Sequence, residues 1–237
     1  MTSQTSASML LFDLDDTLVD DAIATETAAK ALCTHYQPEL EAEAMSHWRR
    51  ALKQHYPAFL QGQLSAAEMR QARAREALQK PELSDKQAED AFEYFMQQYI
   101  AATQLYPDTL VCLDKLRQQG WRLALVSNGP EDMQQRKVKA AGLTHYFEFV
   151  LTAEAAGSAK PDPAIFDKAL AMAKLSAKDC CYVGDNFKND AQGAEAAGLT
   201  SVWLQRQVAG EVVAQPFDNV TWQISGLSQL LECVRLA

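Results

Sequence analysis

The chain has 237 residues, 48% of them hydrophobic, which is enough to bury a sizeable core and to carry an inserted domain. Its formal net charge of −9, with no basic run in the sequence, disfavours a nucleic-acid polymer as partner, since such partners bind clustered Lys and Arg. The apolar run 9–12 stops at Asp13, so we expect no signal peptide, no membrane partner and a cytoplasmic location.

Short apolar runs of the length of buried strands recur along the chain, at 9–12, 123–126, 147–151, 180–183 and 201–204. Helix-like segments lie between the later runs, at 131–141, 163–174 and 189–197, and the C-terminal part adds a strand at 220–224 and a helix at 227–236. Gly142 and Gly198 stand where two of these helices would end. Alternation of strands and helices predicts an α/β fold, a doubly wound parallel sheet with helices on both faces.

The interval after the first strand differs, because about 85 residues rich in Ala, Glu, Gln and Arg separate this strand from a helix that begins near Asp108. Four of its segments have helical character: 26–36, 41–55, 66–78 and 85–103. Pro38, Pro57, Gly62 and Pro81 are the expected breaks. We therefore expect an all-helical domain over 21–104, inserted into a core formed by 1–20 and 105–237.

Polar residues follow the predicted strands, at the sheet edge where doubly wound folds bind ligands. The four segments are Asp13-Leu14-Asp15-Asp16-Thr17, Ser127-Asn128-Gly129, Lys160-Pro161-Asp162-Pro163, and Gly184-Asp185-Asn186 with Asp190. Each of them has an ordinary explanation as a turn or a helix start. Their joint occurrence, in this order and behind apolar strands, favours a functional site.

The acidic residues in these segments predict a metal site and a nucleophile. Asp13 and Asp15 lie two positions apart, so both face one side of an extended strand unless an early turn redirects the second. With Asp185 they would form a carboxylate-rich pocket that needs a cation, and hard oxygen ligands beside water and phosphate suit Mg²⁺. An Asp can also form an acyl phosphate, with Lys160 and the Ser127 hydroxyl on the phosphoryl oxygens.

The four segments resemble, in order, the four motifs of the haloacid dehalogenase superfamily of phosphotransferases, and the resemblance covers essentially the whole core. It implies a Rossmann-like core with Asp13 as nucleophile and Asp15 as general acid and base. It also implies Mg²⁺ held by Asp13, Asp185 and the backbone carbonyl of Asp15, with Asp190 as an accessory metal carboxylate.

The same motifs supply the expected substrate-binding residues, which are Thr17, Ser127, Asn128 and Lys160. A helical insertion between the first and second motifs resembles the first cap type of the family, which closes over small phosphorylated metabolites. Arg49, Arg50, Arg70 and Arg73 are cap cations that could contact an anionic substrate, but solvated helix faces explain each of them better, so they are not counted among the site residues. The expected partner is a small-molecule phosphate ester, and the chain is expected to be a monomer or a homodimer.

The function expected from these residues is Mg²⁺-dependent hydrolysis of a phosphomonoester, a nucleotide or sugar phosphate, through an aspartyl-phosphate. Dehalogenation is disfavoured because the dehalogenases of the family lack the second carboxylate of the first motif, here Asp15. Three alternatives stay open: a phosphomutase, a phosphonate hydrolase using a cap lysine such as Lys30 or Lys53, and a non-catalytic binding protein with the same fold.

Overall fold

The computed structural model describes residues 9–206, 215–217 and 220–236. The chain divides into two compact units. The core unit comprises Met1–Asp20 and Gln104–Ala237, and the helical unit is Asp21–Thr103. The two connections run side by side, because Val19 pairs with Leu105 and the Asp20 amide donates to the Gln104 carbonyl at 3.0 Å.

The described strands of the core unit form one seven-stranded sheet with the order β3-β2-β1-β4-β5-β7-β6. Its strands are β1 (Met9–Phe12), β2 (Arg122–Ser127), β3 (Val150–Thr152), β4 (Cys180–Gly184), β5 (Thr200–Leu204), β6 (Gln215–Phe217) and β7 (Val220–Ile224). Neighbouring strands are parallel except β6, which runs antiparallel to β7. The predicted doubly wound α/β fold is confirmed, and its strand order reverses beside β1, where such folds bind ligands.

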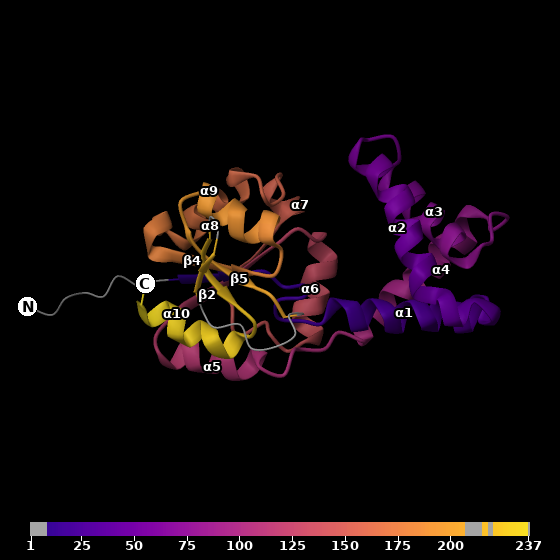
Figure 1. The fold of residues 1–237 in the computed structure, drawn as a ribbon. Coiled ribbons are helices and arrows are strands. Elements are labelled where there is room, and N and C mark those ends of the chain that lie inside the picture. Colours follow the sequence, from indigo (N-terminus) through magenta and orange to yellow (C-terminus); the bar gives the residue numbers. More distant parts are fainter. Residues whose placement is uncertain (1–8, 207–214, 218–219, 237) are drawn as a thin grey trace, which may run out of the picture. The chain divides into compact units, whose positions relative to one another are not determined.

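Helices cover both faces of the sheet (Figure 1). The core helices are α5 (Thr109–Gln118), α6 (Glu131–Ala140), α7 (Ala153–Ala156), α8 (Pro163–Ala173), α9 (Gly193–Ala196) and α10 (Leu230–Leu236). Buried side chains of α5, α6 and α10 pack on one face, whereas those of α8 and α9 pack on the other. Single helical turns lie at Ala177–Asp179 and Leu227–Gln229, and a π-helix at Phe187–Gln192.

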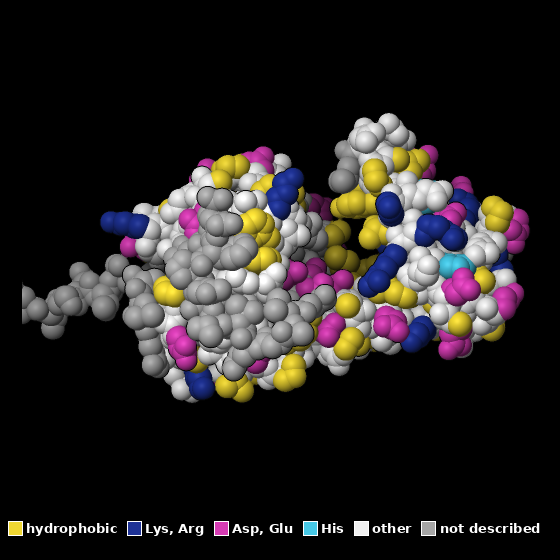
Figure 2. Space-filling model, viewed as in Figure 1, with side chains coloured by type: hydrophobic (Ala, Val, Ile, Leu, Met, Phe, Trp, Pro, Cys, Tyr) yellow, Lys and Arg dark blue, Asp and Glu magenta, His cyan; other side chains and the backbone are white. Residues whose placement is uncertain are grey.

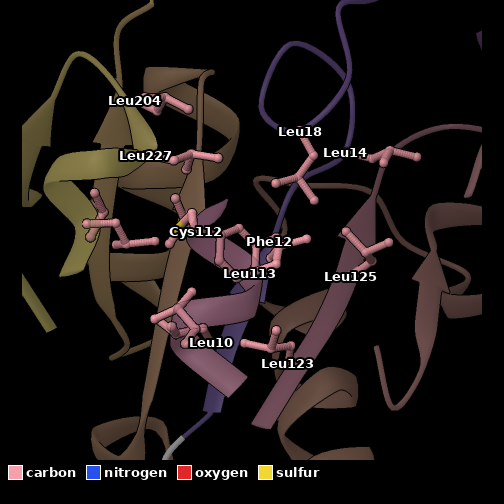
Figure 3. Packing of buried hydrophobic residues seen from close by; sticks show 14 of the residues in the cluster. Leu10, Phe12, Leu14, Leu18, Cys112, Leu113, Leu123, Leu125, Leu204 and Leu227 are labelled. Atoms are coloured by element: carbon pink, nitrogen blue, oxygen red, sulfur yellow. The ribbon is translucent and has the colours of Figure 1, made fainter. Parts of the chain in front are cut away.

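Strand β1 is buried on both sides and fixes the position of the residues that follow it. Leu10, Phe12 and Leu14 point into the cluster that contains Leu113 of α5 (Figure 3), and Leu11 packs into the opposite cluster. Burying one such side chain stabilises the fold by about 1.5–3 kcal/mol, so packing on both faces anchors the strand. Its register is given by parallel pairing, in which Phe12 lies opposite Leu125 of β2 and Val183 of β4.

The helical unit contains α1 (Asp21–Tyr36), a 3₁₀ turn (Pro38–Glu43), α2 (Ala44–Leu60), α3 (Ala66–Leu78) and α4 (Asp85–Ala101). Ser65 and Ser84 form capping boxes that begin α3 and α4. Trp48 stacks on Phe95 with ring centroids 3.5 Å apart, and the Arg73 guanidinium lies 4.4 Å from the Trp48 ring centroid. In the part of the chain described, no helix combines the length and apolar character that crossing a membrane requires.

Three local predictions were wrong, and one strand was not predicted. Helix α2 continues through Pro57 to Leu60, because a proline in the last turn removes one hydrogen bond without blocking the rest of the helix. Strand β3 occupies 150–152 instead of 147–151, and β6 had no predicted counterpart. The segment predicted as one helix at 189–197 consists of the π-helix Phe187–Gln192 followed by α9. Asn186 caps the π-helix, its side chain accepting a hydrogen bond from the Asn189 amide.

Basic side chains on the visible face of the core unit are isolated from one another (Figure 2). In the helical unit, several basic side chains form ion pairs with carboxylates. Arg50 pairs with Glu76 and Arg70 with Glu89, so two of the four arginines considered for substrate contact already have anionic partners.

Candidate active site

The chain stays extended after β1 and carries two carboxylates before it turns. The Asp13 amide donates to the Val183 carbonyl at 2.9 Å, which continues the pairing of β1 with β4. The turn comes at Asp16, whose φ of 57° lies in the left-handed region that Asp tolerates better than most residues. Asp13 is buried, and the Asp15 side chain is 30% exposed. The two carboxylates thus occupy different environments.

Lys160 lies at the centre of a buried polar cluster below the Asp13 carboxylate. Its ammonium donates to Asp13 Oδ1 at 2.6 Å, to Asp190 Oδ1 at 2.6 Å and to the Tyr182 hydroxyl at 2.7 Å. Burial would lower the pKa of Lys160, but the charges of Asp13 and Asp190 raise it above its usual range. The ammonium stays charged, and all three of its donors go to protein groups.

The loop that carries Lys160 is held by Asn128, which follows β2. Asn128 Oδ1 accepts from the Lys160 amide at 2.8 Å, and Nδ2 donates to the Lys160 carbonyl at 2.9 Å. Asp190 is held by the Asn186 amide, which donates to its Oδ2 at 2.9 Å. A Cβ on Gly184 would come within 2.4 Å of the Asp190 carboxyl, so glycine is required at the end of β4.

Asp13, Asp185 and Asp190 could hold a metal ion. Each offers a carboxylate oxygen, and these oxygens lie within 4.8 Å of one another. Burial raises the pKa of Asp13 well above its usual value against the opposing charge of Lys160, and the pKa of Asp185 rises to about 7 through burial and then through Asp190. The cluster thus carries more negative charge than one lysine offsets. Three oxygen ligands with this excess charge fit Mg²⁺.

Two residues predicted to bind substrate, Thr17 and Asn128, form hydrogen bonds with neighbouring site residues. Thr17 is fully buried, and its hydroxyl accepts from the Asp185 amide at 3.1 Å while lying 3.4 Å from Asp13 Oδ2. The Asn128 amide is occupied by the Lys160 backbone. Ser127 is buried at the end of β2, and its Oγ accepts from Gln134 Nε2 at 2.6 Å.

Sequence reasoning missed three buried polar residues of the site: Tyr182, Gln134 and Lys137. Tyr182 donates to the Val126 carbonyl at 2.8 Å and so joins β4 to β2 beneath Lys160. Gln134 and Lys137 lie on α6 and both bond to Asp15. The available signal was their spacing of three, which places both polar side chains on one helix face behind the Ser127 loop.

The family model for haloacid dehalogenase-like hydrolases matches residues 8–198, which include every residue of this site. The chain belongs to this family of hydrolases. The phosphoserine phosphatase of Thermus thermophilus is 30% identical, with 86% of this chain and 90% of that protein aligned. The phosphoglycolate phosphatase of Aliivibrio fischeri is 32% identical, with 83% of each chain aligned.

Solved structures similar to this chain include a dehalogenase and a hydrolase bound to magnesium. A 2-haloacid dehalogenase from Pseudomonas syringae pv. Tomato DC3000 is 30% identical with a TM-score of 0.71, covering 98% of this chain and all of that one. The Bacillus subtilis HAD-hydrolase YfnB, solved bound to magnesium, has a TM-score of 0.75 at 21% identity, covering 97% of this chain and 99% of that one. The latter likeness shows the fold, so the reaction must be argued from the residues.

Proposed function

We propose that the chain is a Mg²⁺-dependent phosphatase that hydrolyses a small phosphate monoester through an aspartyl-phosphate on Asp13. The observation that carries this proposal is the pair of carboxylates after β1. Asp13 is buried against the charged Lys160, whereas Asp15 is partly exposed and hydrogen-bonded to α6. Two carboxylates in such different environments are suited to different roles, one as nucleophile and one as proton carrier.

In the first step, an oxygen of Asp13 attacks phosphorus and the bond from phosphorus to the ester oxygen breaks, while Asp15, which enters this step protonated, gives its proton to the leaving alkoxide. In the second step, Asp15 takes a proton from water, which attacks phosphorus and breaks its bond to Asp13. Inorganic phosphate leaves and both carboxylates return to their initial state. Lys160 keeps Asp13 in place and offsets its charge throughout.

The Ser127 hydroxyl is prepared to donate to a phosphoryl oxygen. Its Oγ accepts from Gln134 Nε2 at 2.6 Å and from the Gly129 amide at 3.3 Å. A hydroxyl has two acceptor positions and one donor, so these contacts leave the proton for a third partner. Mg²⁺, held by Asp13, Asp185 and Asp190, would offset the charge on the phosphoryl oxygens.

Phosphate transfer fits this chain better than dehalogenation does. Release of a halide needs no proton, whereas release of an alkoxide does, and Asp15 supplies a carboxylate for that purpose. Relatives named for their reactions include phosphatases of phosphoserine, phosphoglycolate and N-acylneuraminate 9-phosphate. Their substrates share the phosphate monoester and differ in the rest of the molecule, so we propose the class of substrate and leave the individual metabolite to a screen.

The test is a panel of phosphorylated metabolites with released phosphate as readout, run beside 2-chloropropionate with released chloride as readout. We expect phosphate from several esters, no chloride, and loss of phosphate release in Asp13→Asn. Exhaustive chelation should stop the reaction and Mg²⁺ should restore it. Chloride release without hydrolysis of any ester would overturn the proposal, and so would full activity of Asp13→Asn.

A further inference from the structure

Helix α6 presents two polar side chains to the interior, where a helix packed on a sheet normally places apolar ones. Gln134 and Lys137 are both fully buried, and they lie three residues apart on one face. Lys139, two positions further along the same helix, is exposed as expected for a lysine. Burying an ammonium group is costly unless an anion accompanies it.

The anion is Asp15. Lys137 Nζ donates to Asp15 Oδ1, and Gln134 Nε2 donates to Asp15 Oδ2 at 2.8 Å. Both carboxylate oxygens are therefore held by donors from one rigid helix. The Gln134 amide also packs against Gly129, where a Cβ would approach its nitrogen to 2.3 Å, so the loop after β2 is shaped to admit this side chain.

Gln134 has a buried polar atom that lowers the stability of the fold. Its Oε1 is buried, and the described part of the structure gives it no hydrogen-bond partner. An unsatisfied buried acceptor destabilises a fold, whereas an apolar side chain at this position would not. The presence of glutamine here is explained by its Nε2, which donates hydrogen bonds to both Asp15 and Ser127.

We infer that Lys137 and Gln134 are positioning residues that hold the Asp15 carboxylate in the orientation from which it exchanges protons with the leaving group and with water. The inference rests on the proposed phosphatase activity and adds to it the residues that make Asp15 effective. Each carboxylate oxygen has two acceptor positions, so one donor on each leaves room for a substrate oxygen or a water molecule. Asp15 keeps the exposure this requires, with 30% of its side chain accessible.

The role predicts a dependence on the leaving group that a purely structural role would not show. Without the positioning contacts, Asp15 should transfer protons poorly, so an alkyl phosphate should react slowly. General acid–base catalysis contributes about 10²- to 10⁴-fold, and we expect Lys137→Met to lose about 30- to 100-fold of kcat on an alkyl ester. KM should change by less than about threefold, because binding of the phosphoryl group is intact.

The experiment compares the alkyl phosphate hydrolysed fastest in the substrate panel with 4-nitrophenyl phosphate, whose leaving group needs little protonation. Lys137→Met should give a burst of nitrophenolate at a rate within about threefold of wild type, followed by slow turnover, since the second step still needs a base. Lys139→Met, on the same helix but exposed, is the matched control and should behave as wild type.

A double-mutant cycle completes the test. In an Asp15→Asn background, adding Lys137→Met should change the rate by less than about threefold, because the group it positions is already gone. Gln134→Leu also removes a contact to Asp15, but it frees the Ser127 hydroxyl as well, so some slowing of the burst is expected. If Lys137→Met does not fold, this variant serves through the ratio of the two rates, since hydrolysis of the alkyl ester should slow more than the burst. Equal slowing of the burst and of alkyl ester hydrolysis, or a full effect in the Asp15→Asn background, would overturn the inference. Wild-type protein that hydrolyses neither ester would instead refute the phosphatase proposal itself.

Discussion

Replacing Lys160 by methionine removes a buried positive charge and keeps most of the volume of the side chain. At an effective dielectric constant of about 20, each 2.6 Å contact to Asp13 and Asp190 is worth about 6 kcal/mol of gross attraction. Two such contacts exceed the several kcal/mol that it costs to bury the ammonium. The lysine therefore remains charged in the fold, and its loss leaves two buried carboxylates uncompensated.

We expect Lys160→Met to lower the free energy of unfolding of the metal-free protein by about 3–5 kcal/mol at pH 7.5, the cost of breaking a buried ion pair. The variant stays folded where the total stability exceeds about 6 kcal/mol, within the usual range of about 5–15 kcal/mol. Urea denaturation would measure the loss, with Lys168→Met, an exposed lysine on α8, as matched control. Phosphatase activity should fall by about 10²- to 10³-fold.

The loss of stability should be smaller at pH 5, because the pKa of Asp13 is already raised by burial and protonation removes the repulsion. A loss below about 1 kcal/mol at pH 7.5, together with less than a threefold change in kcat/KM, would refute the view of Lys160 as the charge that holds this cluster together.

Three further predictions concern the metal, the two carboxylates and the helical unit. Protons compete with Mg²⁺ at Asp13 and Asp185, whose pKa values are both raised, that of Asp185 to about 7. The apparent Mg²⁺ affinity measured by calorimetry should therefore rise as the pH increases through 7, and a pH-independent affinity would argue against these carboxylates as ligands. Asp13→Asn should form no acyl phosphate, whereas Asp15→Asn should release a burst of about one nitrophenolate per enzyme from 4-nitrophenyl phosphate and then stall. Near-wild-type turnover of both alkyl and aryl esters by Asp15→Asn would contradict its assignment as general acid and base. Trp48→Ala should lower the free energy of unfolding of the helical unit in urea by about 3–5 kcal/mol, because Trp48 is 3% exposed and stacked on Phe95. The control is Tyr56→Ala, which changes an exposed residue and should cost less than about 1 kcal/mol; equal losses would contradict this packing.

The sheet was predictable because its central strands are short apolar runs followed directly by polar residues. Phe12, Val126 and Val183 each end such a run, so parallel pairing brings the following residues to one edge. The partner of each side chain was not predictable in the same way. Lys160 was expected on the phosphoryl group, and the structure gives its three donors to Asp13, Asp190 and Tyr182.

Contacts between distant segments explain most of what sequence reasoning missed. In the sequence, Tyr182 resembles the other apolar residues of a buried strand. In the structure, its hydroxyl donates to the Val126 carbonyl and accepts from the Lys160 ammonium. Gln134 and Lys137 belong to a helix so polar that its inner face is not evident from hydropathy. The π-helix before α9 contains Asp190, whose carboxylate accepts a hydrogen bond from Lys160, 30 residues earlier in the chain.

The adjacent connections at Val19 and Leu105 have a consequence for how such a protein can change over time. Val19 pairs with Leu105, and the Tyr106 amide donates to the Leu18 carbonyl at 3.1 Å, so hydrogen bonds of the core join the two ends of the inserted segment. The segment between Val19 and Leu105 is therefore topologically a loop of the core. Loop-closure entropy grows slowly with loop length, so lengthening, shortening or exchanging this segment costs the core little. Selection can therefore rework about 80 residues as a replaceable module, while Asp13 and Asp15, only a few positions before the junction, stay fixed by the strand that precedes them.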